Sequence, residues 1–359
     1  MRNPLDAALD DFATPRVNVN KNGEVELGEE VSCDGATKKD YHVITHAHAD
    51  HLSGLSTGSF QIATAATLDL VRAIGKNVRN PLALEYGIPR ELKRGRLYLY
   101  PATHILGASQ VFVETPEGSY AFTGDFKLKG TPVLHPDELV IEATYGRPED
   151  VRDYVNVDVL LLDLVEEGIS KGPVDVYASQ GKLQEVLSLL SALPRWVKII
   201  TDKKSYEVAK VYEKYGIRLP KYYTSTSAEA ALEVREKNPY VGLWPLSVER
   251  TNKNLSIIVT GWAGKPLVYL KKNVVMVGLS DHADFNELLY YVDESKARWV
   301  VADAHRSRSA KTLAKEIEKR LHVRAVAKPR PPPRPGGREF TEVSGVTPIL
   351  RALLCYDLR

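Results

Sequence analysis

The sequence has little cysteine, with only Cys33 and Cys355 among 359 residues. Two cysteines exclude a disulfide scaffold and a zinc site of the CxxC type. No apolar run approaches the ~18 residues that a membrane span needs. The N-terminal segment MRNPLDAALDDF has acidic residues where a signal peptide needs an apolar core. We therefore expect a cytoplasmic protein with no membrane partner.

The sequence also lacks an excess of either charge, because 48 Lys and Arg face 46 Asp and Glu, for a net charge of +2. This balance excludes a histone-like tail protein and an acidic disordered chain, but it neither requires nor excludes a nucleic-acid partner. Residues 301–340 hold 11 basic and four acidic residues, a net +7 against −5 for the remainder. That segment is either a surface that follows a phosphate backbone or a solvated helix with a tail.

Hydrophobic residues make up 43% of the chain, and its length suits two domains or one domain with an insertion. The first ~140 residues are rich in short segments of β-branched and aromatic residues bounded by Gly, Pro or Asp, which predict strands. One helix is expected there, over Ala65–Ile74. The expected strands are Tyr41–Thr45, Arg96–Tyr100, Gln110–Glu114, Tyr120–Thr123 and Leu139–Ile141.

From about residue 150 the pattern alternates between strand and helix, which predicts a parallel sheet covered by helices. The expected helices are Val157–Ser170, Lys182–Leu193, Ser205–Tyr215, Thr226–Lys237, Phe285–Val292 and Ser309–Leu321. The expected strands are Val174–Ala178, Val197–Thr201, Tyr240–Leu246, Ser256–Val259, Val274–Val277 and Trp299–Ala302. After Val326 comes KPRPPPRPGGRE, which cannot be helical inside, and a last helix is expected over Thr347–Leu354.

Three of the nine histidines lie within six residues, in the segment HVITHAHADHLSG. An apolar strand there ends and delivers His46, His48, Asp50 and His51. Neutral imidazoles and carboxylates are zinc ligands, and alternate residues of an extended backbone point the same way. His46 and His48 can therefore bind one ion, with Asp50 and His51 facing a second ion close by.

Further candidate ligands follow apolar strands elsewhere in the chain. His104 lies in YPATHILG, Asp125 in YAFTGDF, His282 in VVMVGLSDHADF and His305 in RWVVADAHRS. Because α/β sheets build sites from the carboxyl ends of several strands, we expect these side chains to gather.

These motifs together resemble the metallo-β-lactamase superfamily, and within it the β-CASP nucleases. The HAHADH run, the later TH-x-x-G histidine and TGD resemble the superfamily. Glu142 in IEATYG, His282 in SDHADF and His305 after its strand are similar to the three β-CASP signatures, and ASQGKLQEVL is similar to the GRAQE-type turn. Thr260, Gly261 and Trp262 resemble the TGW of Artemis-like and ligase-associated DNA nucleases.

The resemblance implies an α/β fold: a metallo-β-lactamase αββα sandwich with an inserted α/β β-CASP domain. Residues 1–150 and 269–328 would form the sandwich, 151–268 the insertion and 329–359 a Pro-rich basic tail. Two zinc ions would hold a hydroxide that attacks a phosphodiester, since paired cations acidify a shared water and clamp the reacting oxygens. By position, His46, His48 and His104 would bind one ion, Asp50, His51 and His305 the other, and Asp125 would bridge them.

The resemblance also assigns roles beyond the ligands. Asp34, twelve residues before His46, would fix the tautomer of a ligand histidine, or is a turn residue before Gly35. Glu142 would orient His282, the candidate general acid. Asp281 and Asp284 either support His282 or cap the following helix.

Other residues are candidates for contacting nucleic acid. Ser179, Gly181 and Lys182 open a helix, where backbone N–H groups and a lysine suit a phosphate, although a plain helix start explains them as well. Trp262 would stack on a base or lie buried between domains. Arg306, where related nucleases usually have Gly, lies in the basic segment.

The sequence therefore predicts a zinc-dependent nuclease, an exonuclease on single-stranded or end-containing DNA. The alternatives are an RNA-processing nuclease of the same family, a small-molecule hydrolase of this superfamily, and a non-catalytic subunit. The intact HAHADH run argues against the last. The long insertion argues against the small-molecule hydrolase. Oligomeric state, polarity and the metal used in the cell do not follow from the sequence.

Overall fold

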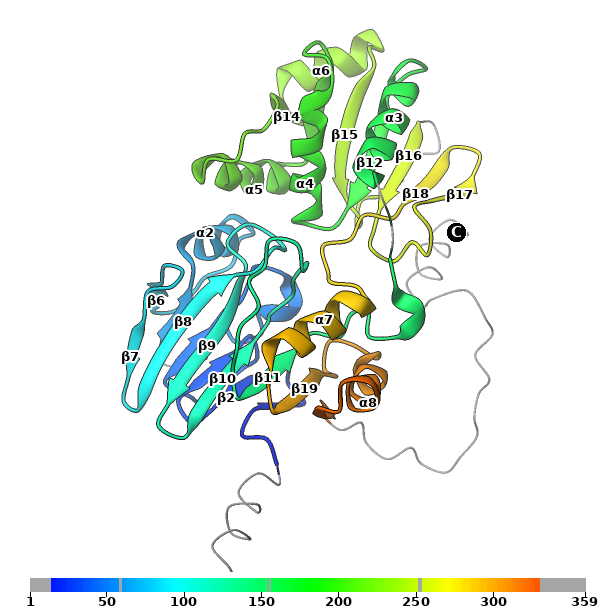
Figure 1. Ribbon diagram of the computed structural model, residues 1–359. Helices are drawn as coiled ribbons and strands as arrows, with labels where there is room; N and C mark the ends of the chain where they lie inside the picture. Colours follow the sequence, from blue (N-terminus) through cyan, green and yellow to red (C-terminus); the bar gives the residue numbers. More distant parts are fainter. Residues whose placement is uncertain (1–13, 58–59, 153, 155, 251–253, 330–359) are drawn as a thin grey trace, which may run out of the picture. The chain divides into compact units, whose positions relative to one another are not determined.

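The computed structural model describes residues 14–57, 60–152, 154, 156–250 and 254–329 (Figure 1). Its strands form three sheets. The predicted helix over Thr347–Leu354 and the tail beyond Pro329 lie outside the described residues, so those predictions stay open.

The first sheet has six short strands in chain order. They are β1 (Asn18–Val19), β2 (Val25–Leu27), β3 (Val31–Cys33), β4 (Tyr41–Val43), β5 (Phe60–Ala63) and β6 (Pro81–Ala83). The first three strands pair antiparallel, and β3 to β6 pair parallel.

The second sheet has seven strands in the order β20-β19-β11-β10-β9-β8-β7. They are β7 (Arg90–Leu92), β8 (Gly95–Pro101), β9 (Ser109–Thr115), β10 (Gly118–Phe122), β11 (Glu138–Ile141), β19 (Trp299–Asp303) and β20 (Arg324–Lys328). Strands β19 and β20 come from the far end of the chain and pair parallel to β11 and to each other. The sheet is therefore built from both sides of a long intervening segment.

These two sheets pack face to face over one apolar core. Strand residues such as Val25, Leu27 and Ile62 from the first sheet meet Leu97 and Val111 from the second, all fully buried. Alternate residues of each strand point to this core, as the two-residue period of a strand requires.

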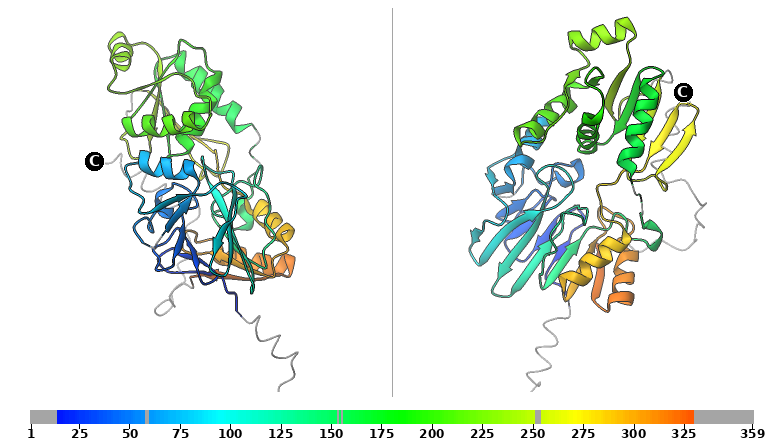
Figure 2. Two further views of the ribbon diagram at one scale, coloured as in Figure 1. Left: turned by 90° about the vertical axis from the view of Figure 1, so that its left-hand side faces the viewer. Right: turned by 45° about the horizontal axis from the view of Figure 1, so that its top comes forward.

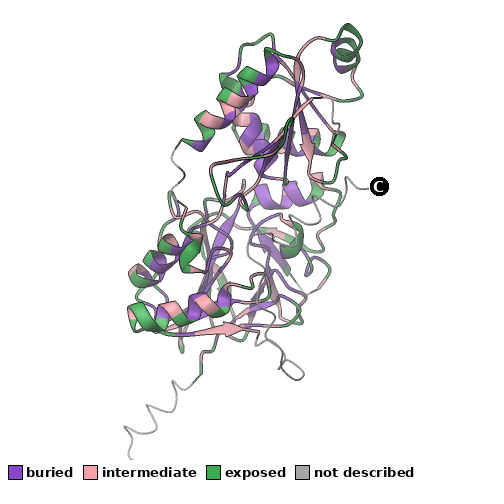
Figure 3. Ribbon diagram, turned by 90° about the vertical axis from the view of Figure 1, so that its right-hand side faces the viewer, coloured by how far each residue is buried: buried purple, intermediate pink, exposed green. Residues whose placement is uncertain are grey.

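Helices cover the two outer faces of this sandwich (Figure 2). Helix α2 (Ala65–Ala73) packs on the first sheet, and α7 (Phe285–Ser295) with α8 (Ala310–Leu321) on the second. In α8 the buried residues Ala310, Leu313, Ala314 and Ile317 recur every three or four positions, and Figure 3 shows the resulting buried and exposed helix faces. The predicted αββα sandwich is confirmed.

The middle of the chain forms the third sheet, in the order β14-β13-β15-β12-β16-β18-β17. Its strands are β12 (Val174–Ala178), β13 (Lys198–Thr201), β14 (Tyr222–Thr224), β15 (Tyr240–Pro245), β16 (Leu255–Val259), β17 (Leu267–Lys271) and β18 (Val274–Val277). All are parallel except β17. Its helices are α3 (Val157–Ile169), α4 (Lys182–Leu189), α5 (Lys203–Lys214) and α6 (Ala228–Glu236).

This sheet has its own apolar core, to which α3 and α4 contribute, so the predicted α/β insertion is confirmed as an architecture. The boundaries of the domains stay a prediction. The pairing of β16 with β18 places the return to the sandwich after Val277, whereas the sequence places it after residue 268, inside β17. Among the helices that the structure describes, none is long and apolar enough to cross a membrane.

Candidate metal centre

The sandwich brings its candidate site residues together by strand direction. Strands β8, β10, β11 and β19 run the same way, because β9 is antiparallel to both β8 and β10 and the later pairs are parallel. Their carboxyl ends therefore meet at one edge of the sheet. His104 follows β8, Asp125 follows β10, Glu142 follows β11 and His305 follows β19. The histidine run follows β4 of the facing sheet.

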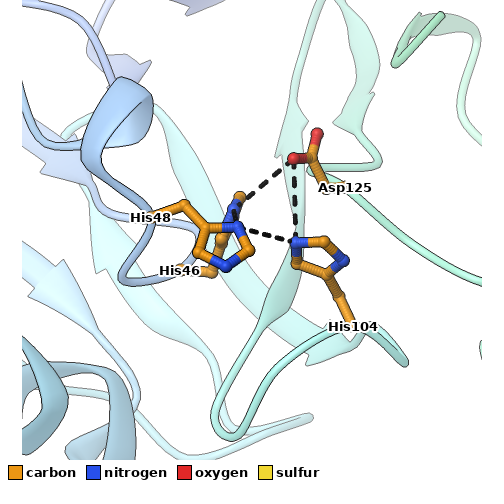
Figure 4. A group of neighbouring side chains, drawn as sticks. All are labelled: His46, His48, His104 and Asp125. Carbon is orange, nitrogen blue, oxygen red and sulfur yellow. Dashed lines mark hydrogen bonds and ion pairs between the residues drawn. The ribbon is translucent and has the colours of Figure 1, made fainter. Parts of the chain in front are cut away.

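Four of the predicted ligands converge there: His46, His48, His104 and Asp125 (Figure 4). Nδ1 of His48 lies 3.2 Å from Nε2 of His46 and 3.0 Å from Nε2 of His104. Oδ2 of Asp125 lies 3.5 Å from His46 Nε2 and 3.8 Å from His104 Nε2. Ligand atoms at 2.0–2.1 Å from a tetrahedral zinc ion are separated by about 3.3–3.4 Å. These four separations lie around that value, and all four atoms lie within 4.8 Å of one another.

The ring nitrogens that face away from this point all have hydrogen-bond partners. Nδ1 of His46 lies 3.0 Å from the Thr45 hydroxyl, which itself donates to Asp34. Nε2 of His48 donates to the Gln180 carbonyl at 3.0 Å, and Nδ1 of His104 to the Asp281 carbonyl at 2.8 Å. These acceptors fix the tautomers and leave the converging nitrogens as lone-pair donors.

Burial keeps these three rings in the neutral form that binds metal. It is the main cause of the lowered pKa of His46, His48 and His104, and it lowers the pKa of His104 to about 3. The cluster is therefore uncharged at neutral pH apart from Asp125, whose pKa is held low by His51 against the effect of burial.

Asp34 is fully buried and lies behind the histidine run. Its carboxylate accepts from the Thr45 N–H at 2.9 Å, from the Thr45 hydroxyl and from Nδ1 of His51 at 2.7 Å. The pKa of Asp34 is lowered because His51 outweighs burial. Asp34 therefore contacts His51 directly and His46 through Thr45, where it can orient both rings.

The other side of His51 faces the remaining carboxylates. Its Nε2 is buried without a hydrogen-bond partner in the described part of the chain. Oδ2 of Asp125 lies 3.3 Å from it and Oδ2 of Asp50 lies 3.6 Å from it. Burial opposes charge on the ring, but Asp125 and Asp34 outweigh it and raise the pKa of His51 to about 10. The carboxylates around His51 thus favour a positive charge at this position. A proton on the ring supplies it here, and a bound cation would supply it as well.

The other ligands predicted for a second ion are less closely gathered. Within the described ranges, no group of three potential ligand atoms within 4.8 Å of one another includes Asp50 or His305. The Asp50 side chain is 63% exposed, and His305 is exposed with its ring against Gly23. The turn after β19 is held by Asp303, which accepts from the N–H groups of residues 305 and 306. His305 therefore stays a predicted ligand.

His282 and Glu142 form a pair beside the cluster. Nδ1 of His282 lies 3.0 Å from Oε2 and 3.2 Å from Oε1 of Glu142, and its ring centre lies 4.8 Å from that of His104. Burial lowers the pKa of His282, but Glu142, Asp125 and Asp281 together raise it to about 9. These carboxylates thus favour the protonated form of the ring, which is the form that a general acid needs.

Two residues predicted to contact nucleic acid point inward instead. Lys182 is 3% exposed, and its Nζ lies 2.8 Å from Oδ1 of Asp281. The Arg306 guanidinium is 9% exposed and bonds to Asp303, the Gly23 carbonyl and the Asp50 carbonyl. Both cations are held by buried carboxylates in this structure, and their contact with a phosphate stays a prediction.

The other candidates for nucleic-acid contact differ in exposure. Ser179 is exposed and Gly181 is buried. Trp262 is 43% exposed, and its ring centre lies 5.9 Å from that of Tyr145, which in turn lies 6.1 Å from His282. The guanidinium of Arg152 stacks 3.9 Å above the Tyr145 ring. Trp262 is therefore an exposed aromatic surface on the His282 side of the centre.

Several residues of the site were missed from the sequence. Thr45, Gln180 and Tyr145 carry no metal-ligand chemistry, and Gln180 acts through its backbone. Asp284 caps α7 by accepting from the Glu287 N–H at 2.9 Å, so the capping alternative holds for it. Asp281 instead pairs with Lys182.

A sandwich of this architecture with histidines and carboxylates gathered at one edge defines a metal-binding protein of the metallo-β-lactamase fold. A solved structure titled "Crystal Structure of a Protein of Unknown Function from Enterococcus faecalis V583" shares the fold, with a TM-score of 0.54 and 15% identity over 91% of this chain and 88% of that one. No protein-family model matches the sequence.

Similar curated proteins indicate which family within this fold the chain belongs to. An uncharacterized protein in the lig 3′ region of Acidianus ambivalens is 38% identical over 38% of this chain and its own full length. A probable DNA ligase of Opitutus terrae is 31% identical over 70% of this chain, and RNase aCSPSF2 of Saccharolobus solfataricus is 30% identical over 47%. The chain belongs to the β-CASP nucleases of the metallo-β-lactamase superfamily. It spans only 25% of that ligase and 42% of that RNase.

Proposed function

We propose that this chain hydrolyses phosphodiester bonds of nucleic acid with two zinc ions. The observation that carries the proposal is the convergence of three histidine nitrogens and Asp125 at zinc-ligand spacing, with the charged His282–Glu142 pair beside them. Ions held there would acidify a bound water and neutralise charge on the phosphate. His46, His48, His104 and Asp125 would hold one, and Asp50, His51, His305 and Asp125 the other.

The chain's own groups supply the remaining steps. His282, kept protonated by Glu142, donates the proton from Nε2 to the leaving oxygen, because its Nδ1 is engaged by the carboxylate. Asp34 holds His51 and, through Thr45, His46. Arg306 holds the Asp50 turn from behind through the Asp50 carbonyl, so we assign it a positioning role.

The preferred substrate is single-stranded or end-containing DNA, cleaved exonucleolytically. Two observations support DNA: the likeness to a protein named as a probable DNA ligase, and the TGW segment that places Trp262 exposed near Tyr145. A base stacked on Trp262 would lie on the side of the centre where His282 protonates the leaving group. The likeness to a protein named as an RNase favours RNA processing as the second candidate.

The experiment is cleavage of 5′-labelled and 3′-labelled DNA and RNA oligonucleotides of one sequence, resolved on a denaturing gel. A ladder or a mononucleotide that accumulates from one end identifies an exonuclease and its polarity, whereas fixed internal fragments contradict it. Faster cleavage of DNA supports the preferred substrate, and faster cleavage of RNA replaces it with the second candidate. Hydrolysis of a thioester with no cleavage of any oligonucleotide would contradict the nuclease proposal.

A further inference from the structure

One turn of the inserted segment reaches two of the candidate metal ligands. This turn, Gln180–Lys182, links β12 to α4. The Gln180 carbonyl accepts from Nε2 of His48 at 3.0 Å, although 132 residues separate them in sequence. Two positions later, Nζ of Lys182 lies 2.8 Å from Oδ1 of Asp281.

The contact with Gln180 decides which nitrogen His48 presents. A neutral imidazole carries one proton, and the carbonyl, which can only accept, draws that proton to Nε2. Nδ1 is then the lone pair that lies 3.0 Å from His104 Nε2 and 3.2 Å from His46 Nε2. Without the carbonyl, nothing among the described contacts would select this tautomer of His48.

The contact with Asp281 acts on a second ligand. The Asp281 carbonyl accepts from Nδ1 of His104 at 2.8 Å, so the position of this residue sets the orientation of the His104 ring. The side chains of Lys182 and Asp281 are 4% and 8% exposed. A carboxylate so deeply buried is costly without its partner, and loss of the Lys182 ammonium would therefore displace the residue that orients His104.

Gly181 permits this close approach. Its φ is +85°, in the region that favours glycine. A Cβ at this position would lie 2.3 Å from Cγ2 of Ile105 and 3.2 Å from Nε2 of His48. Any larger residue would push the turn away from His48 and the loop that carries His104.

We propose that the Gln180–Lys182 turn is a positioning element of the metal centre, through which the inserted sheet sets the affinity of the His46–His48–His104 site. Lys182 is a positioning residue and not a phosphate ligand. The inference rests on the proposed metal centre, but not on the substrate. It also explains why a buried lysine stands at the start of α4, where a plain helix needs none.

The test measures zinc affinity of the full chain by competition with a chromophoric chelator. Lys182→Met keeps the length of the side chain and removes its charge, and should weaken the His46–His48–His104 site by ~10–100-fold. Lys182→Arg, which keeps the charge, should restore most of the affinity. Glu185→Gln is the matched control, because it removes an ion pair of 3.1 Å between the same helix and Lys127 without touching a ligand histidine. It should change the affinity less than twofold.

Two further variants separate positioning from stability. Lys182→Met combined with Asp281→Asn leaves no unpaired charge and should recover the thermal stability of the metal-free protein. Zinc affinity should stay low, because no ion pair then holds residue 281 in the position from which its carbonyl orients His104. Gly181→Ala should weaken zinc binding through the Gln180 contact. Zinc affinity within twofold of the parent in a folded Lys182→Met or in the combined variant would overturn the proposal, as would an equal loss in Glu185→Gln. Because cleavage is not the readout, a parent that binds zinc but cuts no oligonucleotide would contradict the proposed function alone.

Discussion

Replacing Glu142 by glutamine tests the assignment of His282 as the proton donor. The Glu142 side chain is buried, and its two oxygens lie 3.2 Å and 3.0 Å from Nδ1 of His282. Oε1 also accepts from the Phe126 N–H at 2.9 Å. Glutamine keeps this shape and one accepting oxygen, so the main loss is the negative charge beside the ring.

The size of the effect follows from the pKa of His282. Burial lowers this pKa, and the carboxylates, Glu142 foremost, raise it to about 9. A group with a pKa of 9 is ~90% protonated at pH 8, whereas an unperturbed histidine, with a pKa of ~6.5, is only ~3% protonated. Asp125 and Asp281 remain in the variant, so the acid form should fall by up to about 30-fold at pH 8. Bound cations lower the pKa in both proteins, so the difference between the proteins is the quantity to measure.

The assay is kcat for oligonucleotide cleavage between pH 5.5 and 10 for the parent and Glu142→Gln. Activity that needs protonated His282 declines as pH rises through its pKa, so this alkaline limb should move down by about two pH units in the variant. Asp284→Asn is the control, because asparagine caps a helix as well as aspartate and should leave the limb in place. An alkaline limb at the same pH in Glu142→Gln would refute the role given to this pair.

Three further predictions concern other parts of the structure. In Asp34→Asn the side chain is neutral and has one accepting oxygen instead of two, so it cannot accept from both Thr45 and His51. Zinc affinity should therefore fall ~10–100-fold in chelator competition; unchanged affinity would contradict the role of Asp34. Burial lowers the pKa of His42 to about 4, whereas the unfolded chain takes up that proton near pH 6.5. The contribution of neutral His42 to the free energy of unfolding is therefore fully present above about pH 6.5. It decreases as the pH falls toward 4, by at most on the order of 3 kcal/mol. His42→Gln should flatten this decline in urea unfolding of the metal-free protein, and an unaltered slope would exclude His42 as its source. Trp262→Ala should weaken binding of single-stranded DNA ~10-fold, and Tyr269→Ala, which removes a still more exposed aromatic side chain, should not; equal losses would show that Trp262 has no special part.

The elements that the sequence predicts well are those long enough to show a period. The segments Val174–Ala178 and Val274–Val277 are strands with the expected bounds, and α3, α5 and α8 end within two residues of the prediction. By contrast, β1, β2 and β3 have only two or three residues each. A strand that short shows no alternation, and it exists because its neighbours in the sheet supply its hydrogen bonds.

The site was predictable where its chemistry lies in side chains at strand ends. The histidine run, His104 and Asp125 follow strands whose carboxyl ends share an edge, and the structure gathers four of them. The acceptors that orient them were not predictable. Gln180 and Asp281 act through backbone carbonyls on histidines 132 and 177 residues away, and every residue has a carbonyl.

The positions of lysines and arginines in the sequence were the least reliable basis for predicting site residues. Lys182 and Arg306 looked like phosphate contacts because nucleic acid is anionic. In the structure, each is held by a carboxylate, Asp281 and Asp303 respectively. A sequence shows that a cation is present, but the distance to its counter-ion depends on how the sheets pack, and this decides whether the cation faces solvent.

The most direct test of the metal-dependent phosphodiesterase is to titrate zinc into chelator-stripped protein and measure bound metal and cleavage of labelled single-stranded DNA in the same samples. We expect no cleavage before zinc is added, and activity that rises as the sites fill. We also expect Asp50→Ala and His104→Ala to lose cleavage by several orders of magnitude. Full cleavage by the stripped protein, or by either variant, would contradict the metal-dependent mechanism.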